Sequence, residues 1–210
     1  MPASELAAFE TNLQRALDLS ATAGSLRNMV TPAVDLSDLY RAAYMQGVSA
    51  FDHFIHEEVR VRMLEWHGRP QSTWPAGFAT FKIPISSTHQ AGRSVPDAAV
   101  RFEAEIRSQH GHLSFQHPDK VAAACRLVSN TEIWQTIATA LGTKKQGKLS
   151  PSQVAKKDWG LIIDRRNLIV HEADLDPTPP RSRRYPIDKE MTDEALQKIG
   201  LVTRLIAASL

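Results

Sequence analysis

The residues best suited to chemistry are Arg166, Asn167 and His171, which form an Arg-Asn-x-x-x-His pattern near the end of a predicted helix. Histidine is the side chain that can act as an acid or a base near neutral pH. Arginine carries a permanent positive charge on a planar group that donates several hydrogen bonds to an anion. The pattern therefore indicates a site for an anionic substrate.

Arg166 occupies an unusual place on this helix. At about 100° per residue, the apolar face is formed by Trp159, Ile162, Ile163, Ile169, Val170 and Ala173. Arg166 falls in the middle of that face. Beside it runs a narrow polar seam of Asp164, Asn167 and His171. A charged side chain on such a face needs an ionic partner, or the face must meet something other than the core.

Two interpretations of Arg166 remain open at this point. In the first, Arg166 forms a buried ion pair with Glu57 or Asp52 of a long central helix, because buried arginines are usually paired. In the second, the face belongs to a subunit interface, where an anionic substrate meets Arg166 and His171.

The elements that position these residues are all predicted to be helical. Apolar residues recur at helical spacing over about 4–19, 36–67, 96–109, 118–128, 132–141, 151–173 and 188–208. A stretch with Gly, Thr and Pro at 21–33 is predicted to end the first helix. Residues 68–96 form a long irregular connector, in which 78–85 could include a short extended piece. The pattern predicts an all-α antiparallel helical bundle.

The composition fits one globular domain over 1–210, with its core at about 36–208 and the N-terminal helix at about 4–19. The chain has 210 residues, a formal charge of +2 and a single cysteine. One cysteine excludes an intramolecular disulfide, and charged residues in the first helix exclude a signal peptide. No apolar run is long enough for a membrane span. We therefore expect a cytoplasmic protein with no membrane association.

Several polar residues outside the motif have both a structural and a functional interpretation. Asp52, His56 and Glu57 border the apolar stripes of the central helix, where internal hydrogen bonds are the simpler explanation and support of the site is the alternative. His53, His56, His110 and His112 offer His-x-x-His and His-x-His pairs. Without cysteine or a clear acidic third ligand they are expected to be ordinary surface or core-edge histidines, so no metal and no cofactor is predicted.

Two basic loops flank the motif helix in the sequence. The first contains Lys144, Lys145 and Lys148, and the second contains Arg181, Arg183 and Arg184. Clusters of charge in loops are usually solvated surface. On either side of a helix that is suited to an anionic substrate they are also plausible phosphate contacts.

The motif segment 163–174, Ile-Asp-Arg-Arg-Asn-Leu-Ile-Val-His-Glu-Ala-Asp, resembles the Arg-polar-x-x-x-His signature of the HEPN superfamily, and more narrowly its RiboL-PSP-HEPN branch. Residues 38–43 with 49–57 resemble the early long helix of that branch. Residues 115–121 with 132–134 resemble its middle section. The three blocks occur in the same order and cover the chain from about 9 to 205.

The resemblance implies a helical bundle that forms a homodimer, with the motif helices of two subunits facing each other. Many members are metal-independent endoribonucleases of bacterial defence or toxin–antitoxin systems. It therefore implies RNA as substrate and catalytic roles for Arg166, Asn167 and His171, with Asp164, Asp52, His56 and Glu57 in support. It also admits an antitoxin or a defence protein as a partner. The alternative is a non-catalytic HEPN module used for dimerisation or partner binding, with Arg166 in a structural ion pair.

Overall fold

The computed structural model describes residues 3–84, 98–178 and 183–210, and these residues are all-α. They contain eight α-helices, one short 3-10 helix at Gln71–Thr73 and no β-strand. The α-helices are α1 Ala3–Arg27, α2 Ser37–His67, α3 Ala76–Ala79, α5 Ala98–His110, α6 Pro118–Arg126, α7 Ile133–Ala140, α8 Pro151–His171 and α9 Lys189–Ser209. The predicted helical bundle is confirmed. No helix in the described part of the chain has both the length and the apolar character of a membrane span.

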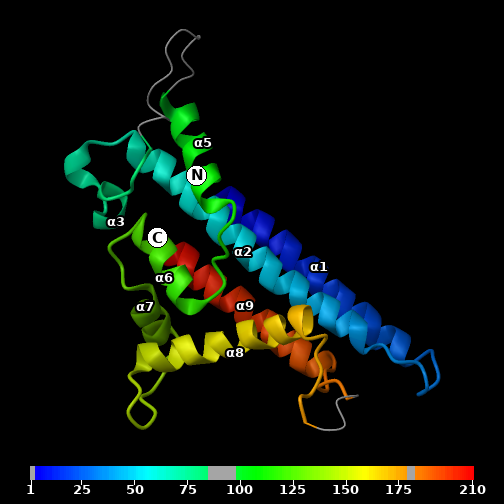
Figure 1. Cartoon of the computed structure of the whole chain (residues 1–210). Coiled ribbons are helices and arrows are strands. Elements are labelled where there is room, and N and C mark those ends of the chain that lie inside the picture. The colour runs from blue at the N-terminus through cyan, green and yellow to red at the C-terminus, as the bar shows by residue number, and fades with distance from the viewer. Residues whose placement is uncertain (1–2, 85–97, 179–182) are drawn as a thin grey trace.

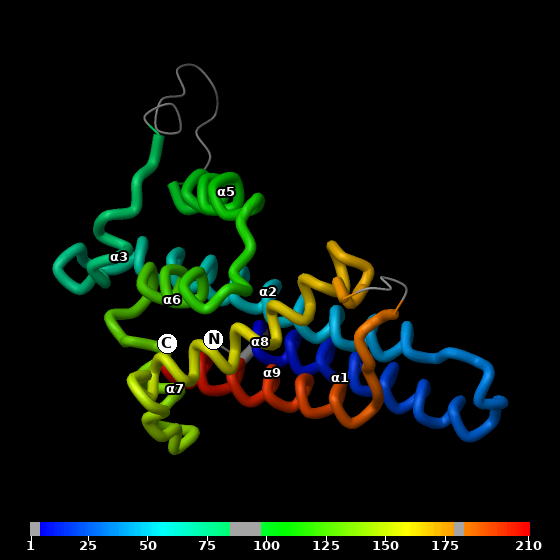
Figure 2. Tube along the Cα trace, turned by 60° about the horizontal axis from the view of Figure 1, so that its bottom comes forward, coloured from blue at the N-terminus to red at the C-terminus, as the bar shows by residue number. Residues whose placement is uncertain are grey.

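The bundle is built around a long antiparallel hairpin of α1 and α2, and α9 packs against both helices (Figure 1). α8 crosses below the hairpin in this view and contacts α2 and α7. Figure 2 shows that α5 and α6 lie on a different side of α2 from α1 and α9. The long α2 is therefore the central element, as its two apolar stripes predict.

The end of the first helix differs from the sequence-based prediction. α1 continues to Arg27, well past the predicted end at 19, because its last turns are held by the rest of the fold. Ala23 is fully buried, and Ser20 Oγ donates to Asp193 Oδ1 of α9 at 2.6 Å. Gly24 costs such a helix only about 1 kcal/mol, which tertiary contacts outweigh.

The predicted extended piece at 78–85 is wrong over its first residues. Phe78 lies in α3 and is 5% exposed. Its ring meets Trp74 at 4.8 Å and Phe102 of α5 at 5.8 Å between centroids. Burial of this aromatic side chain favours the helical turn, and residues 80–84 contain no strand. The rest of the connector, 85–97, lies outside the described residues.

Trp159 fixes the place where α8 crosses α2. Its ring is fully buried and lies 4.4 Å from the ring of Phe51 on α2 and 6.3 Å from that of Trp134 on α7. The indole Nε1 donates to the carbonyl oxygen of Gln116 at 2.7 Å. One turn further along α8, the hydroxyl of Tyr44 donates to the carbonyl oxygen of Ile162 at 3.1 Å. These contacts set the orientation of the helix that carries Arg166 and His171.

Candidate functional site

α8 begins and ends with sequence-encoded signals. Ser150 and Gln153 form a reciprocal capping box, with Pro151 in the first turn. At the other end, Ala173 and Asp174 adopt left-handed conformations with φ of 50° and 60°. The backbone N–H of Asp174 then donates to the carbonyl oxygen of Leu168 at 2.9 Å, which closes the last turn. The helix therefore ends at His171, and Ala173 is exposed rather than on the predicted apolar face.

The bundle covers most of the apolar face of α8, but not all of it. Trp159, Ile162, Ile163 and Ile169 are buried, whereas Arg166 is half-buried and Val170 is 43% exposed. All of these residues project from one side of the helix. The last two turns of α8 thus present a mixed apolar and charged surface to solvent.

Arg166 is held only locally. Its Nη1 donates to Asn167 Oδ1 at 3.1 Å, and no carboxylate among the described residues pairs with it. Asp164 and His171 are exposed on the adjacent seam. The guanidinium of Arg166 and the imidazole of His171 are therefore both available to a ligand or to a second protein surface.

Asp52, one of the predicted partners of Arg166, is engaged elsewhere. Its Oδ1 accepts from the backbone N–H of Phe115 at 2.7 Å, and its Oδ2 accepts from Gln116 Nε2 at 2.9 Å. His56 Nε2 lies 3.9 Å from Asp52 Oδ1. Asp52 thus ties α2 to the segment after α5.

Glu57, the other predicted partner, binds two different arginines. Its Oε2 lies 2.7 Å from Arg60 Nη2, and its Oε1 lies 3.4 Å from Arg107 Nη1 of α5. Burial by itself would raise the pKa of Glu57, but the hydrogen bond and charge of Arg60 bring that pKa below its ordinary value. Of the two interpretations left open for Arg166, the ion pair with Glu57 or Asp52 is therefore absent, because both carboxylates already have nearer partners.

The structure separates the two basic loops. Lys144, Lys145 and Lys148 are exposed before the N-terminus of α8. The 21 residues of α8 put that end about 30 Å from His171. These lysines and the motif therefore do not form one surface within a single chain.

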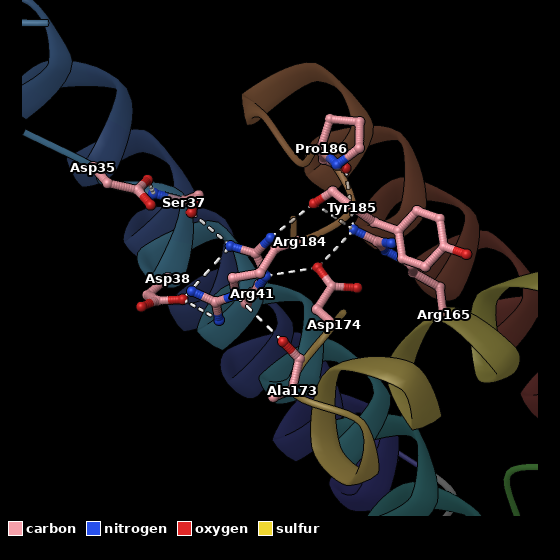
Figure 3. Close-up of polar contacts among 10 residues, drawn as sticks. All are labelled: Asp35, Ser37, Asp38, Arg41, Arg165, Ala173, Asp174, Arg184, Tyr185 and Pro186. Carbon is pink, nitrogen blue, oxygen red and sulfur yellow. Dashed lines mark hydrogen bonds and ion pairs between the residues drawn. The ribbon is translucent and has the colours of Figure 1, made fainter. Parts of the chain in front are cut away.

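The second basic loop lies next to the C-terminal end of α8. Arg184 Nη2 pairs with Asp38 at 2.6 Å, and its Nε donates to the carbonyl oxygen of Ala173 at 3.3 Å (Figure 3). Arg183 is exposed. Arg181 lies outside the described residues. The contacts of Arg184 therefore hold its own loop in place. Of the two described arginines in this loop, Arg183 is the better candidate for binding a phosphate group.

The sequence analysis missed a buried ionic cluster at the C-terminal end of α8, which contains Arg41, Arg165 and Asp174 (Figure 3). Asp174 is fully buried, and its Oδ2 accepts from Arg41 Nε at 2.6 Å and from Arg165 Nη2 at 2.8 Å. Arg41 itself is 3% exposed and also donates to the carbonyl oxygen of Tyr185 at 2.8 Å. The cluster joins α2, the end of α8 and the segment at Tyr185, which leads into α9.

This cluster fixes where the last turn of α8 lies. Asp174 follows His171 by three residues, and Arg165 precedes Arg166 by one. One oxygen of the carboxylate, Oδ1, has no hydrogen-bond partner among the described residues, so the two guanidinium groups provide its charge compensation. Arg41 lies within the block 38–43 quoted above and Asp174 ends the block 163–174, and their opposite charges were the signal available in the sequence.

The left-handed Ala173 leads to a stability prediction. The left-handed conformation costs an alanine about 1–2 kcal/mol relative to glycine. Glycine loses more conformational entropy on folding, so replacing Ala173 by glycine gains only part of this free energy. We expect Ala173→Gly to raise the free energy of unfolding by about 0.5–1 kcal/mol in urea titrations. The matched control, Ala104→Gly at an exposed position within α5, should lower it by about 1 kcal/mol. A loss of stability in both variants would contradict the assigned helix end.

No cluster of three or more His, Cys, Asp or Glu side chains in the described ranges has a geometry that could hold a metal ion. The chain matches no protein-family model, and the comparisons with curated proteins and with solved structures gave no match either. The proposals below therefore depend on the motif and on the geometry of α8.

Proposed function

We propose that this protein is a metal-independent endoribonuclease whose active site forms where the exposed ends of two α8 helices meet. The observation that carries the proposal is the environment of Arg166. It is an arginine on a mainly apolar helix face, with no carboxylate partner in the described part of the chain and with His171 exposed nearby. A guanidinium without a carboxylate partner is suited to bind a phosphate group, and an imidazole is suited to transfer protons.

The chemistry requires two proton-transfer groups. The 2′-oxygen of the RNA forms a bond to phosphorus while the bond from phosphorus to the 5′-oxygen breaks. A neutral imidazole takes the proton of the 2′-hydroxyl, and a protonated imidazole gives a proton to the leaving 5′-oxygen. Arg166 stabilises the charge on the phosphoryl oxygens, and Asn167 orients Arg166.

A single chain offers only one His171 for these two tasks. Arg166 and His171 are also about 140° apart around α8, so they converge poorly within one subunit. A twofold axis at this surface brings together two copies of each residue. The composite site then has its base, its acid and two phosphate-binding arginines.

The assembly is tested by its mass. We expect light scattering at micromolar concentration to give twice the chain mass of 23.3 kDa. Val170→Glu, which puts a charge on the same face without touching the proposed catalytic residues, should shift the population to monomer and abolish cleavage. A wild-type monomer would count against the composite site.

The activity is tested by incubating the purified protein with RNA in the presence of EDTA. We expect cleavage of RNA but not of DNA with the same sequence, because only RNA has the 2′-hydroxyl. The products should carry 2′,3′-cyclic phosphate and 5′-hydroxyl ends. His171→Ala should lower the rate by about 10²-fold or more. Products with 5′-phosphate ends, or activity lost on chelation, would point to metal-dependent hydrolysis instead.

A further inference from the structure

A second polar site lies between α2 and α5, in a pocket of about 350 Å³. The side chains that concern the argument are His53, His56, Glu57, Arg60, Arg107 and His110. Arg41, which contacts the end of α8 at Asp174, is 15 residues before His56 on α2. That separation corresponds to about 22 Å, so the pocket is distinct from the surface around Arg166.

Two of the imidazoles are positioned by the same aromatic ring. The ring of Phe115 lies 4.5 Å from that of His56 and 5.4 Å from that of His110, measured between centroids. His110 is 7% exposed, and its Nδ1 is buried with no hydrogen-bond partner in the part of the chain that the structure describes. Nε2 is then the ring's only other hydrogen-bonding atom, and this histidine lines the pocket.

The arginines of the pocket belong to a four-membered ionic ring. Arg60 contacts Glu57 at 2.7 Å and Glu103 at 2.9 Å, and Arg107 contacts Glu103 at 3.1 Å and Glu57 at 3.4 Å. The two positive and two negative charges cancel. The side chain of Arg107 nevertheless remains 55% exposed, although each of its three guanidinium nitrogens contacts Glu57 or Glu103.

The net charge of the pocket therefore depends on its histidines. Burial lowers the pKa of His110, and the neighbouring His56 and His112 lower it further. Each protonation adds a positive charge next to the others, and a bound anion would offset that repulsion. The charged or titratable groups that face the imidazoles are Asp52, Glu57 and Arg60 of α2, Glu103 and Arg107 of α5, and His112 of the following segment.

We propose that this pocket binds a phosphate-class oxyanion, with His53, His56 and His110 as hydrogen-bond donors and Arg107 as the accessible cation. The same chemistry fits a free phosphate ion and a phosphate of RNA. The proposal does not depend on ribonuclease activity, because none of these side chains belongs to the α8 motif.

The test is a titration of the intact protein with inorganic phosphate, followed by NMR of the histidine ring protons at pH 6 and pH 8. We expect saturable shifts of the His53, His56 and His110 signals, because the three imidazoles line the pocket. Zinc, added separately, should not give saturable shifts of the same three signals. Uniform, unsaturable shifts with phosphate at both pH values would overturn the proposal.

Variants at exposed positions keep the test independent of folding. His53→Gln and Arg107→Gln, each checked by its melting temperature, should weaken phosphate binding by about 10-fold, whereas His171→Gln should leave it unchanged. Equal binding by His53→Gln, Arg107→Gln and wild type would reject the site. A non-cleavable RNA analogue that competes with phosphate identifies RNA as the source of the group, and failure to compete identifies a small phosphate ligand.

Discussion

Replacing Asp174 by alanine should lower the free energy of unfolding by about 3–5 kcal/mol, the cost of leaving a buried charge without its partner. Arg41 is 3% exposed and has Asp174 as its one fully buried carboxylate partner in the described part of the chain. Arg165 loses the same partner and keeps its contacts with backbone carbonyl groups and with the ring of Tyr185. Urea titration followed by circular dichroism measures the loss.

The matched control is Asp164→Ala, which removes an exposed carboxylate from the same helix and should change stability by less than about 0.5 kcal/mol. Asp174→Asn keeps the shape and one acceptor oxygen but loses the charge, so it should fall between the two. If Asp174→Ala were as stable as the control, the cluster in Figure 3 could not be what holds the end of α8.

The helices could be predicted because their signals are local. Two apolar stripes predicted α2 at about 36–67, close to the observed Ser37–His67. Ser150, Pro151 and Gln153 marked the start of α8 through a capping box whose hydrogen bonds are present. The end of α1 could not be predicted in this way, because the contact of Ser20 with Asp193 joins residues 173 positions apart.

In the candidate site, too, local features could be predicted from the sequence, and contacts between distant segments could not. The position of Arg166 on the apolar face follows from helical spacing alone. In the structure the side chain is half-buried, as expected for a charged residue on an otherwise apolar face. The buried pair of Arg41 and Asp174 spans 133 positions and depends on how the chain turns after His171. No periodicity contains that information.

The incorrect partner for Arg166 has a more instructive cause. Glu57 and Arg60 are three residues apart on α2, a spacing at which helical side chains meet. A local partner of this kind forms without the entropy cost of bringing distant segments together. Arg60 therefore contacts one oxygen of Glu57 and Arg107 of α5 contacts the other, which leaves neither oxygen for Arg166.

Arg166→Ala should lower RNA cleavage by at least about 10²-fold and leave the melting temperature close to that of the wild type. The rate falls because the arginine stabilises charge that develops on the phosphoryl oxygens. Stability is retained because the side chain is only half-buried and its hydrogen bond is to the adjacent Asn167. Arg166→Lys, which keeps the charge but loses the planar group, should recover only part of the activity.

The neighbouring arginine provides the decisive comparison. Arg165→Ala removes one of the two guanidinium groups that hold buried Asp174, so its main effect should be a lower melting temperature. Assayed well below that temperature, it should cleave RNA at a rate close to the wild type. Arg166→Ala should thus lower the cleavage rate and Arg165→Ala the melting temperature, although both variants remove an arginine side chain and the two positions are consecutive. A large fall in melting temperature for Arg166→Ala, with cleavage intact in the cold, would place Arg166 in the structural framework and remove it from the active site.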